Sequence, residues 1–317
     1  MIIALTTPAH SYTFADIRPL VPQLRLMTYP AAFHAKRLPR ATYIFCDLDR
    51  LSYWELELAG RLHAWLRGAG LHVLNDPARV RQRYPLLRLL KACGRNRFDS
   101  WLPDHGQAPD VFPVFLRTQS AHRGTLTGLL HTTAEADAAL QDALAQGYAR
   151  KDLMFVEYCA EPNDAGVFRK LSCFRIGDAV LPWLAVHETK WSAKYGETGV
   201  AGDAGYQDEY DIVRTNRYAT AIGPVFGLAE IDYGRADFAI VGGDIQTYEI
   251  NTNPSLEILR DHPFALRLEA QRLALEAMKE AFAAIDARPG PNVVVREPIL
   301  LAQRRRDRPR PYLRWTP

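Results

Sequence analysis

The sequence contains few cysteines, and none of them lies close to another. Its 317 residues include four, which are Cys46, Cys93, Cys159 and Cys173. The absence of a Cys-x-x-Cys motif argues against a zinc site, and the wide spacing argues against a disulfide framework. We therefore expect reduced thiols, most of them buried.

Long apolar runs are also missing. No stretch approaches the roughly 18 consecutive apolar residues of a transmembrane helix. The opening segment MIIALTTPAHSY lacks the basic start and the apolar core of a signal peptide. We therefore expect a cytoplasmic protein without a membrane partner.

Positively and negatively charged residues are nearly balanced in number. The net charge is +3, and the contents of 24% charged and 48% hydrophobic residues are ordinary for a soluble globular protein, so no DNA partner is expected. Much of the excess lies in a proline-interrupted run near the C-terminal end, with Arg304, Arg305, Arg306, Arg308, Arg310 and Arg314. Such a run is usually a solvated or loosely docked terminus, and contact with RNA or a membrane surface is the alternative.

The most informative segment that is present spans residues 227–256. Its two apolar runs, RADFAIV and IQTYEIN, flank a Gly-Gly turn, which is typical of a β-hairpin. Glu249 and Asn251 are two residues apart and share one face of a strand, and Asp237 on the facing strand can join them. Two carboxylates and an amide oxygen are hard ligands that suit Mg²⁺. An exposed hairpin with scattered acids is the alternative.

The rest of the chain alternates strand and helix patterns. Strands at 1–7, 41–49 and 71–75 around a helix at 53–70 predict a parallel α/β lobe. Further on, the patterns predict helices at 78–94, 133–147, 210–227 and 266–285, strands at 111–118, 126–131, 152–159 and 169–188, and a mobile glycine-rich loop at 195–209.

An acid followed after twelve residues by Glu-x-Asn and a proline-containing turn (EINTNPSL) resembles the metal-binding signature of the ATP-grasp superfamily. The order of the elements from about Ile3 to Ile285 also resembles that superfamily. The resemblance implies a mixed α/β and α+β fold, with an N-terminal parallel α/β lobe at 1–76. Two lobes that clasp the nucleotide would follow at 77–156 and 157–287, with an Arg/Pro-rich tail at 288–317.

The resemblance also implies a set of phosphate-binding residues. Arg83 and Arg117 take the places of two family lysines, which keeps the positive charge but changes the donor geometry. The loop with His122, Arg123 and Gly124 takes the place of the small loop that covers the phosphates. The alternatives are a surface salt bridge for Arg117 and a plain turn for the loop.

By the same resemblance, the segment MFVEYCAEP corresponds to the hinge between the clasping lobes. Glu157, Tyr158 and Cys159 would lie against the adenine, and Glu161 would bind the ribose hydroxyls, since a carboxylate accepts two donors well. The alternative makes both glutamates ordinary charges at a strand end.

The next strand departs from the family pattern, because FRKLS lacks the acid of the usual Asp-x-Arg. We expect Lys170 to face the phosphates and Arg175 to reach toward the acceptor pocket as catalytic residues. Asn253 and Ser255 in the turn after the hairpin are candidates for substrate contact. A single histidine, His187, has no partner in the pattern, so we interpret it as structural rather than as a base.

Together these features imply ATP and Mg²⁺ as cofactors and a carboxylate-amine ligase of the ADP-forming type. Its substrates would be small or peptide-like acids and amines, and the sequence leaves a homo-oligomer open. Because three family residues are altered, an inactive ATP-binding protein is one alternative, and an ATP-grasp kinase is another.

Overall fold

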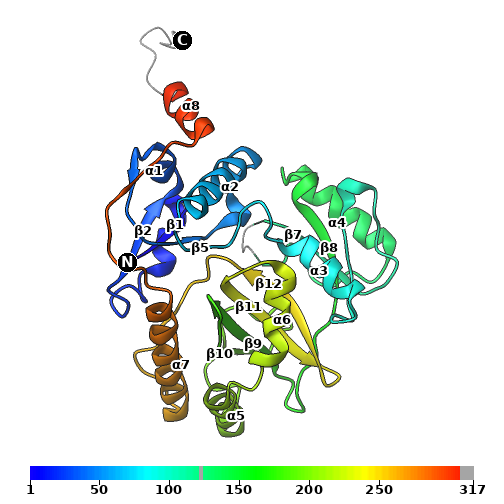
Figure 1. Ribbon diagram of the computed structural model, residues 1–317. Coiled ribbons are helices and arrows are strands. Elements are labelled where there is room, and N and C mark those ends of the chain that lie inside the picture. The colour runs from blue at the N-terminus through cyan, green and yellow to red at the C-terminus, as the bar shows by residue number, and fades with distance from the viewer. Residues whose placement is uncertain (121–123, 308–317) are drawn as a thin grey trace, which may run out of the picture.

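The computed structural model describes residues 1–120 and 124–307. Within that part of the chain, the strands form two four-stranded sheets, one three-stranded sheet and one two-stranded sheet (Figure 1). The expected domain boundaries after residues 76, 156 and 287 stay a prediction, and the second of them falls inside a strand.

The N-terminal sheet is parallel, as predicted, and has the order β2-β1-β4-β5. Its strands are β1 (Ile2–Thr6), β2 (Leu24–Thr28), β4 (Thr42–Phe45) and β5 (Val73–Leu74). Side chains alternate along β1: Ile2 and Ala4 pack on one face, and Ile3 and Leu5 on the other. Both faces are therefore covered.

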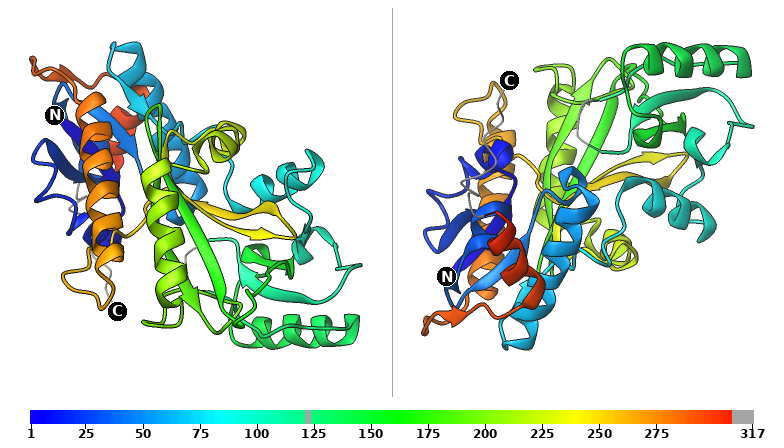
Figure 2. Two further views of the ribbon diagram at one scale, coloured as in Figure 1. Left: turned by 90° about the horizontal axis from the view of Figure 1, so that it is seen from below. Right: turned by 90° about the horizontal axis from the view of Figure 1, so that it is seen from above.

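Helices cover the two faces of this sheet differently. On one side lie α1 (Tyr29–His34) and α2 (Tyr53–Gly68), and α2 begins at a capping box between Ser52 and Glu55. On the other side lies the long helix α7 (Ala265–Ala284), as Figures 1 and 2 show.

The central sheet is antiparallel, with the order β6-β8-β7. Helix α4 packs on one face and α3 on the other. Pro85 lies in the first turn of α3, where a missing N–H costs nothing, so the helix begins at Arg83. The elements are α3 (Arg83–Ala92), β6 (Ser100–Trp101), β7 (Val114–Thr118), α4 (Thr133–Ala145) and β8 (Leu153–Glu157).

The C-terminal sheet is antiparallel, with the order β10-β9-β11-β12. Helix α6 packs against one face, and α5 and α7 lie beside the edge strand β10. The elements are β9 (Phe168–Ile176), β10 (Ala179–Glu188), α5 (Gly202–Thr215), α6 (Ala219–Ala229), β11 (Tyr233–Val241) and β12 (Asp244–Asn251).

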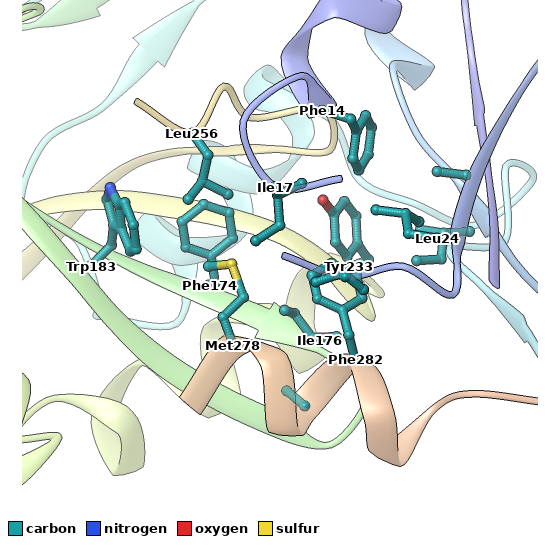
Figure 3. Close-up of a cluster of buried hydrophobic side chains, with 14 of the residues drawn as sticks. Phe14, Ile17, Leu24, Phe174, Ile176, Trp183, Tyr233, Leu256, Met278 and Phe282 are labelled. Carbon is teal, nitrogen blue, oxygen red and sulfur yellow. The ribbon is translucent and has the colours of Figure 1, made fainter. Parts of the chain in front are cut away.

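A shared core joins the N-terminal and C-terminal sheets. Phe14, which follows β1, stacks on Tyr233 of β11 with ring centroids 6.1 Å apart, and Tyr233 also contacts Phe282 of α7 (Figure 3). On the other side of this cluster, Trp183 meets Phe174 edge to face. The lobes are thus held together by buried apolar contacts near the place where the cavity described below opens.

Three sequence-based expectations about elements were wrong. The single helix expected at 210–227 is two helices, because Asn216 adopts a left-handed conformation (φ 47°) between α5 and α6. The loop expected at 195–209 ends early, since α5 begins at Gly202. The strand expected at 126–131 is absent, and only isolated bridges at Thr125 and Leu130 occur there.

The chain after α7 returns to the N-terminal sheet. Strand β13 (Val293–Val294) pairs with β3 (Arg37–Leu38), and α8 (Pro298–Arg306) packs on α1 and α2. Arg304 donates from Nε to the carbonyl of Phe33 at 2.9 Å, so this part of the basic tail is docked. Arg308, Arg310 and Arg314 lie outside the described residues.

The four cysteines are free, and Cys46 and Cys173 are buried, but Cys159 is half-buried and Cys93 is exposed, so two rather than most of the thiols are buried. Among the residues that the structure describes, no helix is both long and apolar enough to cross a membrane.

Candidate active site

One cavity of about 750 Å³ is lined by residues of the central and C-terminal sheets and by the segments that follow β1 and β4 of the N-terminal sheet. Most of the residues singled out from the sequence line it: Arg117, Gly124, Glu157, Tyr158, Cys159, Glu161, Lys170, Asp237, Glu249, Asn251, Asn253 and Ser255. Arg83 and Arg175 do not line it, and His122 and Arg123 lie outside the described residues.

The predicted hairpin is formed by β11 and β12, and its turn has positive φ at both glycines, Gly242 (54°) and Gly243 (84°). Asp237 and Glu249 are direct partners in the antiparallel register. Because register partners share a face, both carboxylates face the cavity, and Asn251 follows two residues later on that face.

Among the residues that the structure describes, four cationic side chains contact these two carboxylates. Asp237, which is 2% exposed, accepts from Arg235 at 2.8 Å, and Lys170 Nζ lies 3.5 Å from it. Glu249 accepts from Arg83 Nε at 2.9 Å and from Arg117 Nη2 at 3.1 Å. Arg117, Lys170 and Arg235 line the cavity beside the two carboxylates, and their positive charges favour an anion there.

Arg83 and Arg117 differ in their contacts and in their position relative to the cavity. Arg83 is buried and also donates to the carbonyls of Thr118 (3.0 Å) and Gln119 (2.6 Å), so it connects the start of α3 to the end of β7. Arg117 lines the cavity, and burial together with the nearby Arg83 lowers its pKa to about 10, which still leaves it charged at neutral pH. Of the two arginines, Arg117 is the one placed to meet a ligand in the cavity.

The chemistry of the donors fits Mg²⁺, because two carboxylates and an amide oxygen on one face are hard ligands. Asn251 Oδ1 also accepts the backbone N–H of Asn253 at 2.8 Å, and an amide oxygen has a second lone pair for a metal. The described residues contain no group of three or more His, Cys, Asp or Glu side chains that could hold a metal ion, so the amide is needed to complete this set. The metal ligands stay a prediction.

The expected hinge residues border the cavity, with part of their polar groups engaged. Glu157 accepts the backbone N–H of Asp99 at 2.8 Å, and the Cys159 carbonyl accepts from Tyr248 Oη at 2.7 Å. Glu161 accepts from Gly242 N at 2.6 Å, which connects the hinge to the hairpin turn. A ribose that binds Glu161 would have to share it with this backbone group.

An aromatic group lies beside the hinge. Trp191, in the loop after β10, packs on Phe115 (centroids 4.9 Å apart) and meets Tyr158 edge to face (5.6 Å). Flat apolar side chains are a suitable wall for a planar base. No periodic pattern in the sequence pointed to Trp191, because it lies in an irregular segment.

Lys170 and Arg175 are five residues apart on β9, so they face opposite sides of the sheet. Lys170 faces the cavity, whereas Arg175 donates to the carbonyl of Gly177 (2.8 Å) and lies 3.4 Å from Asp232. The structure therefore does not bring Arg175 to the acceptor pocket, and we leave it out of the site.

The turn after β12 places both substrate candidates at the cavity. Asn253 is buried and joins two lobes, since it accepts from Thr13 Oγ1 at 2.8 Å and donates to the His10 carbonyl at 3.2 Å. The Ser255 carbonyl accepts from Arg235 Nη1 at 3.2 Å, and the Ser255 hydroxyl makes no hydrogen bond within residues 1–120 and 124–307, so it is available to a ligand. Asn253 therefore has a clear structural role besides any contact with substrate.

The end of β10 carries a neutral histidine and an organising glutamate. His187 is 5% exposed, and burial and the nearby Arg267 lower its pKa to about 4. Glu188 accepts the backbone N–H groups of Lys194 (2.7 Å), Tyr195 (2.6 Å) and Gly196 (2.8 Å). The loop after β10 is therefore folded around the Glu188 carboxylate.

Sequence reasoning missed several residues of the cavity wall: His10, Asp47, Arg50, Trp191 and Arg235. Arg235 could have been found, because it is two residues before Asp237 on the same strand and therefore shares its face. Asp47 and Arg50 follow a strand whose end carries no motif, and only the tertiary fold brings them to the cavity.

No family model matches the chain, and no curated protein matches it. Among solved structures, the chain is similar to D-alanine–D-alanine ligase from Bacillus anthracis complexed with ATP. The two are 11% identical, the match covers 97% of this chain and 99% of that chain, and the TM-score is 0.50.

Two further similarities have lower TM-scores. D-cycloserine synthetase DcsG is 15% identical, with 89% of this chain and 100% of that chain covered and a TM-score of 0.49. A RimK domain protein ATP-grasp from Sphaerobacter thermophilus is 12% identical, with coverages of 90% and 100% and a TM-score of 0.48.

Proposed function

We propose that this chain, which has the ATP-grasp fold, is an ATP- and Mg²⁺-dependent ligase that activates a carboxylate and joins it to an amine. The observation that carries the proposal is the wall on which Asp237 and Glu249 are paired in register and surrounded by cations. Similarity to an ATP-bound ligase of the same fold supports ATP as the nucleotide and ligation as the reaction.

The proposed reaction has two steps. In the first, a carboxylate oxygen attacks the γ-phosphorus of ATP, the bond to the β,γ-bridging oxygen breaks, and ADP leaves. In the second, the amine nitrogen attacks the carbonyl carbon of the acylphosphate, the carbon–oxygen bond to phosphate breaks, and the amine loses a proton. The products are an amide, ADP and phosphate.

The side chains of the cavity would act mainly by electrostatics and positioning. Arg117 and Lys170 approach the two carboxylates from β7 and β9 and supply charge where phosphoryl oxygens become more negative. A Mg²⁺ ion held by Asp237, Glu249 and Asn251 would neutralise phosphate charge. This scheme requires no nucleophilic side chain.

The adenine base of ATP would lie near the hinge segment. Trp191, Phe115 and Tyr158 line the cavity and provide an apolar surface for it. Gly124 has φ 89° at the end of the loop expected over the phosphates, a conformation that favours glycine. Backbone N–H groups could approach phosphate oxygens there.

The test is a phosphate-release assay with ATP, Mg²⁺ and panels of acids and amines. A ligase releases ADP and phosphate only when both an acid and an amine are supplied. Hydroxylamine at high concentration would trap the acylphosphate as a hydroxamate and reveal the first step alone.

Two other results identify the alternatives. ATP binding without turnover in any mixture indicates an inactive nucleotide-binding protein, and a phosphorylated product without free phosphate indicates a kinase. Either result overturns the ligase assignment without changing the fold.

A further inference from the structure

The N-terminal sheet contributes a charged group that the proposed reaction has not used. Its strands β1 and β4 are adjacent and parallel, so their carboxyl ends open at the same edge. Thr7 follows β1, and Asp47 follows β4. In open parallel sheets, ligands bind in the crevice beyond this edge, and Asp47 lines the cavity there.

Asp47 is a buried centre to which the neighbouring side chains are tied. It is 1% exposed and adopts a left-handed conformation (φ 58°), which is uncommon for a residue other than glycine. Its Oδ2 accepts from both the backbone and the hydroxyl of Thr7 and lies 3.4 Å from His10 Nδ1. Its Oδ1 lies 3.0 Å from Arg50 Nε.

These contacts use the inner nitrogens and leave the outer ones for a ligand. Across residues 1–120 and 124–307, neither terminal nitrogen of Arg50 donates a hydrogen bond, and Nε2 of His10 has no hydrogen-bond partner. Both side chains line the cavity and are 24% exposed. Asp47 therefore fixes two donor groups at the cavity wall.

Arg50 differs in this respect from the arginine on the opposite lobe. All three guanidinium nitrogens of Arg235 have hydrogen-bond partners, because Nε and Nη2 bind Asp237 and Nη1 binds the Ser255 carbonyl. The contacts of Asn253 with Thr13 and His10 bring the loop after β12 next to the Asp47 group. Arg50 is thus a guanidinium with two donors to spare, close to the two substrate candidates.

We infer that Arg50, oriented by Asp47 and assisted by His10, binds a carboxylate of the substrate other than the one that is activated. A guanidinium fork matches a carboxylate with two parallel hydrogen bonds. The substrate class is therefore an acid or an amine that carries an additional carboxylate. This inference rests on the proposed function, and it leaves open which of the two substrates carries the group.

The test removes the charge of the contact from the protein by mutation and from the substrate by amidation. We propose Arg50→Ala, with Arg50→Gln as a variant that keeps a donor for Asp47, and Arg61→Ala as a control on an exposed arginine of the same lobe. In the acid arm, glutarate is compared with its monoamide. In the amine arm, D- and L-alanine are compared with their α-carboxamides. Thermal melting of each variant monitors the fold.

We expect the wild type to prefer the probe that carries the extra carboxylate over its amide, and we expect the Arg50 variants to lose this preference. Amidation of the extra carboxylate should raise KM by about 10- to 100-fold in the wild type, which is the range for the loss of hydrogen bonds to charged groups. Arg50→Ala and Arg50→Gln should raise KM for the carboxylate probe by the same factor. They should leave KM for the amide probe unchanged. Affinity for ATP should stay within about twofold. The arm in which the effect appears identifies the substrate that carries the group.

Binding measurements keep the test independent of turnover. Saturation-transfer NMR with the same probes, Mg²⁺ and a non-hydrolysable ATP analogue compares carboxylate with amide in the wild type and in both variants. If the wild type catalyses no ligation but still prefers the carboxylate through Arg50, the proposed function fails and the Arg50 site stands. Equal losses for carboxylate and amide, no preference in the wild type, or an equal loss of ATP affinity would overturn the inference.

Discussion

Glu249 on β12 and Arg83 at the start of α3 are joined by a hydrogen bond of 2.9 Å between Oε2 and Nε, although 166 positions separate them in the sequence. This contact couples the proposed metal hairpin to the central lobe. A change at Glu249 therefore affects both the charge in the cavity and the packing between two lobes.

We predict that Glu249→Gln reduces turnover by at least about 100-fold, because it removes one of the two carboxylates proposed to hold Mg²⁺. The structure adds a cost that the sequence did not indicate, since buried Arg83 loses its charged partner. Its carbonyl acceptors, at Thr118 and Gln119, remain, so the loss of unfolding free energy should be about 1–3 kcal/mol. Steady-state kinetics and urea unfolding measure the two effects.

Asp244→Asn is the matched control, because Asp244 begins the same strand but is exposed and pairs with Arg97 away from the cavity. It should leave both turnover and Mg²⁺ dependence unchanged. Normal activity with normal Mg²⁺ dependence in Glu249→Gln would remove Glu249 from the proposed metal site.

Arg117→Ala should weaken ATP far more than adenosine, because Arg117 is expected to contact phosphate from the charged wall. Arg117→Lys is the sharper variant, since it keeps the charge but loses the two-donor fork. Calorimetric titration with ATP and with adenosine compares them. An equal loss for both ligands would place Arg117 outside the phosphate site, and a fully active Lys variant would show that charge alone suffices.

The sequence predicted the hairpin and its carboxylates well because the Gly-Gly turn and the two-residue alternation are local signals. The same parity rule separates Lys170 from Arg175, so the expectation for Arg175 could have been corrected without a structure. The place of Arg83 was less accessible, because whether its guanidinium reaches the cavity or Glu249 depends on how α3 packs against β7 and β12.

Other parts of the site depend on contacts between distant segments. His10 and Asp47 come together because β1 and β4 are neighbours, which a strand pattern does not reveal. The break at Asn216 overrode a helical pattern through one left-handed residue. Local periodicity thus predicted most elements, whereas the partners of the charged groups required the tertiary fold.

We propose that the loop after β10, which spans residues 189–201 because α5 begins at Gly202, is a cover over the cavity. We predict that Glu188→Ala frees this loop, since the Glu188 carboxylate accepts three consecutive N–H groups from it. The variant should be cleaved faster by a protease such as trypsin at Lys190 or Lys194. Mg²⁺, ATP and a suitable carboxylate together should slow cleavage in the wild type.

Glu197→Ala is the control for this prediction, because Glu197 lies in the same loop and, in the part of the chain that the structure describes, its carboxylate hydrogen-bonds only to Thr189. Its cleavage should change little in comparison. Equal protease resistance of the free and fully liganded wild-type protein would leave the loop as a passive surface segment.

His187 should make the protein less stable in acid. Its pKa is about 4 in the folded protein, against an ordinary value of 6.5, because burial and Arg267 disfavour the charged form. Between these values the unfolded chain binds more protons, so stability falls as the pH falls from 6.5 toward 4, by about 3 kcal/mol at most. His187→Phe keeps a ring against Tyr206 and removes a buried nitrogen that has no hydrogen-bond partner among the described residues.

We therefore predict that His187→Phe is at least as stable as the wild type at pH 7 and loses less stability between pH 6.5 and 4.5. Urea unfolding at a series of pH values measures this difference. His72→Gln, at an exposed histidine of the N-terminal lobe, should retain the wild-type pH dependence. Parallel stability curves for the wild type and His187→Phe would show that His187 takes up its proton equally well in the folded and unfolded states, contrary to the effect expected from its burial.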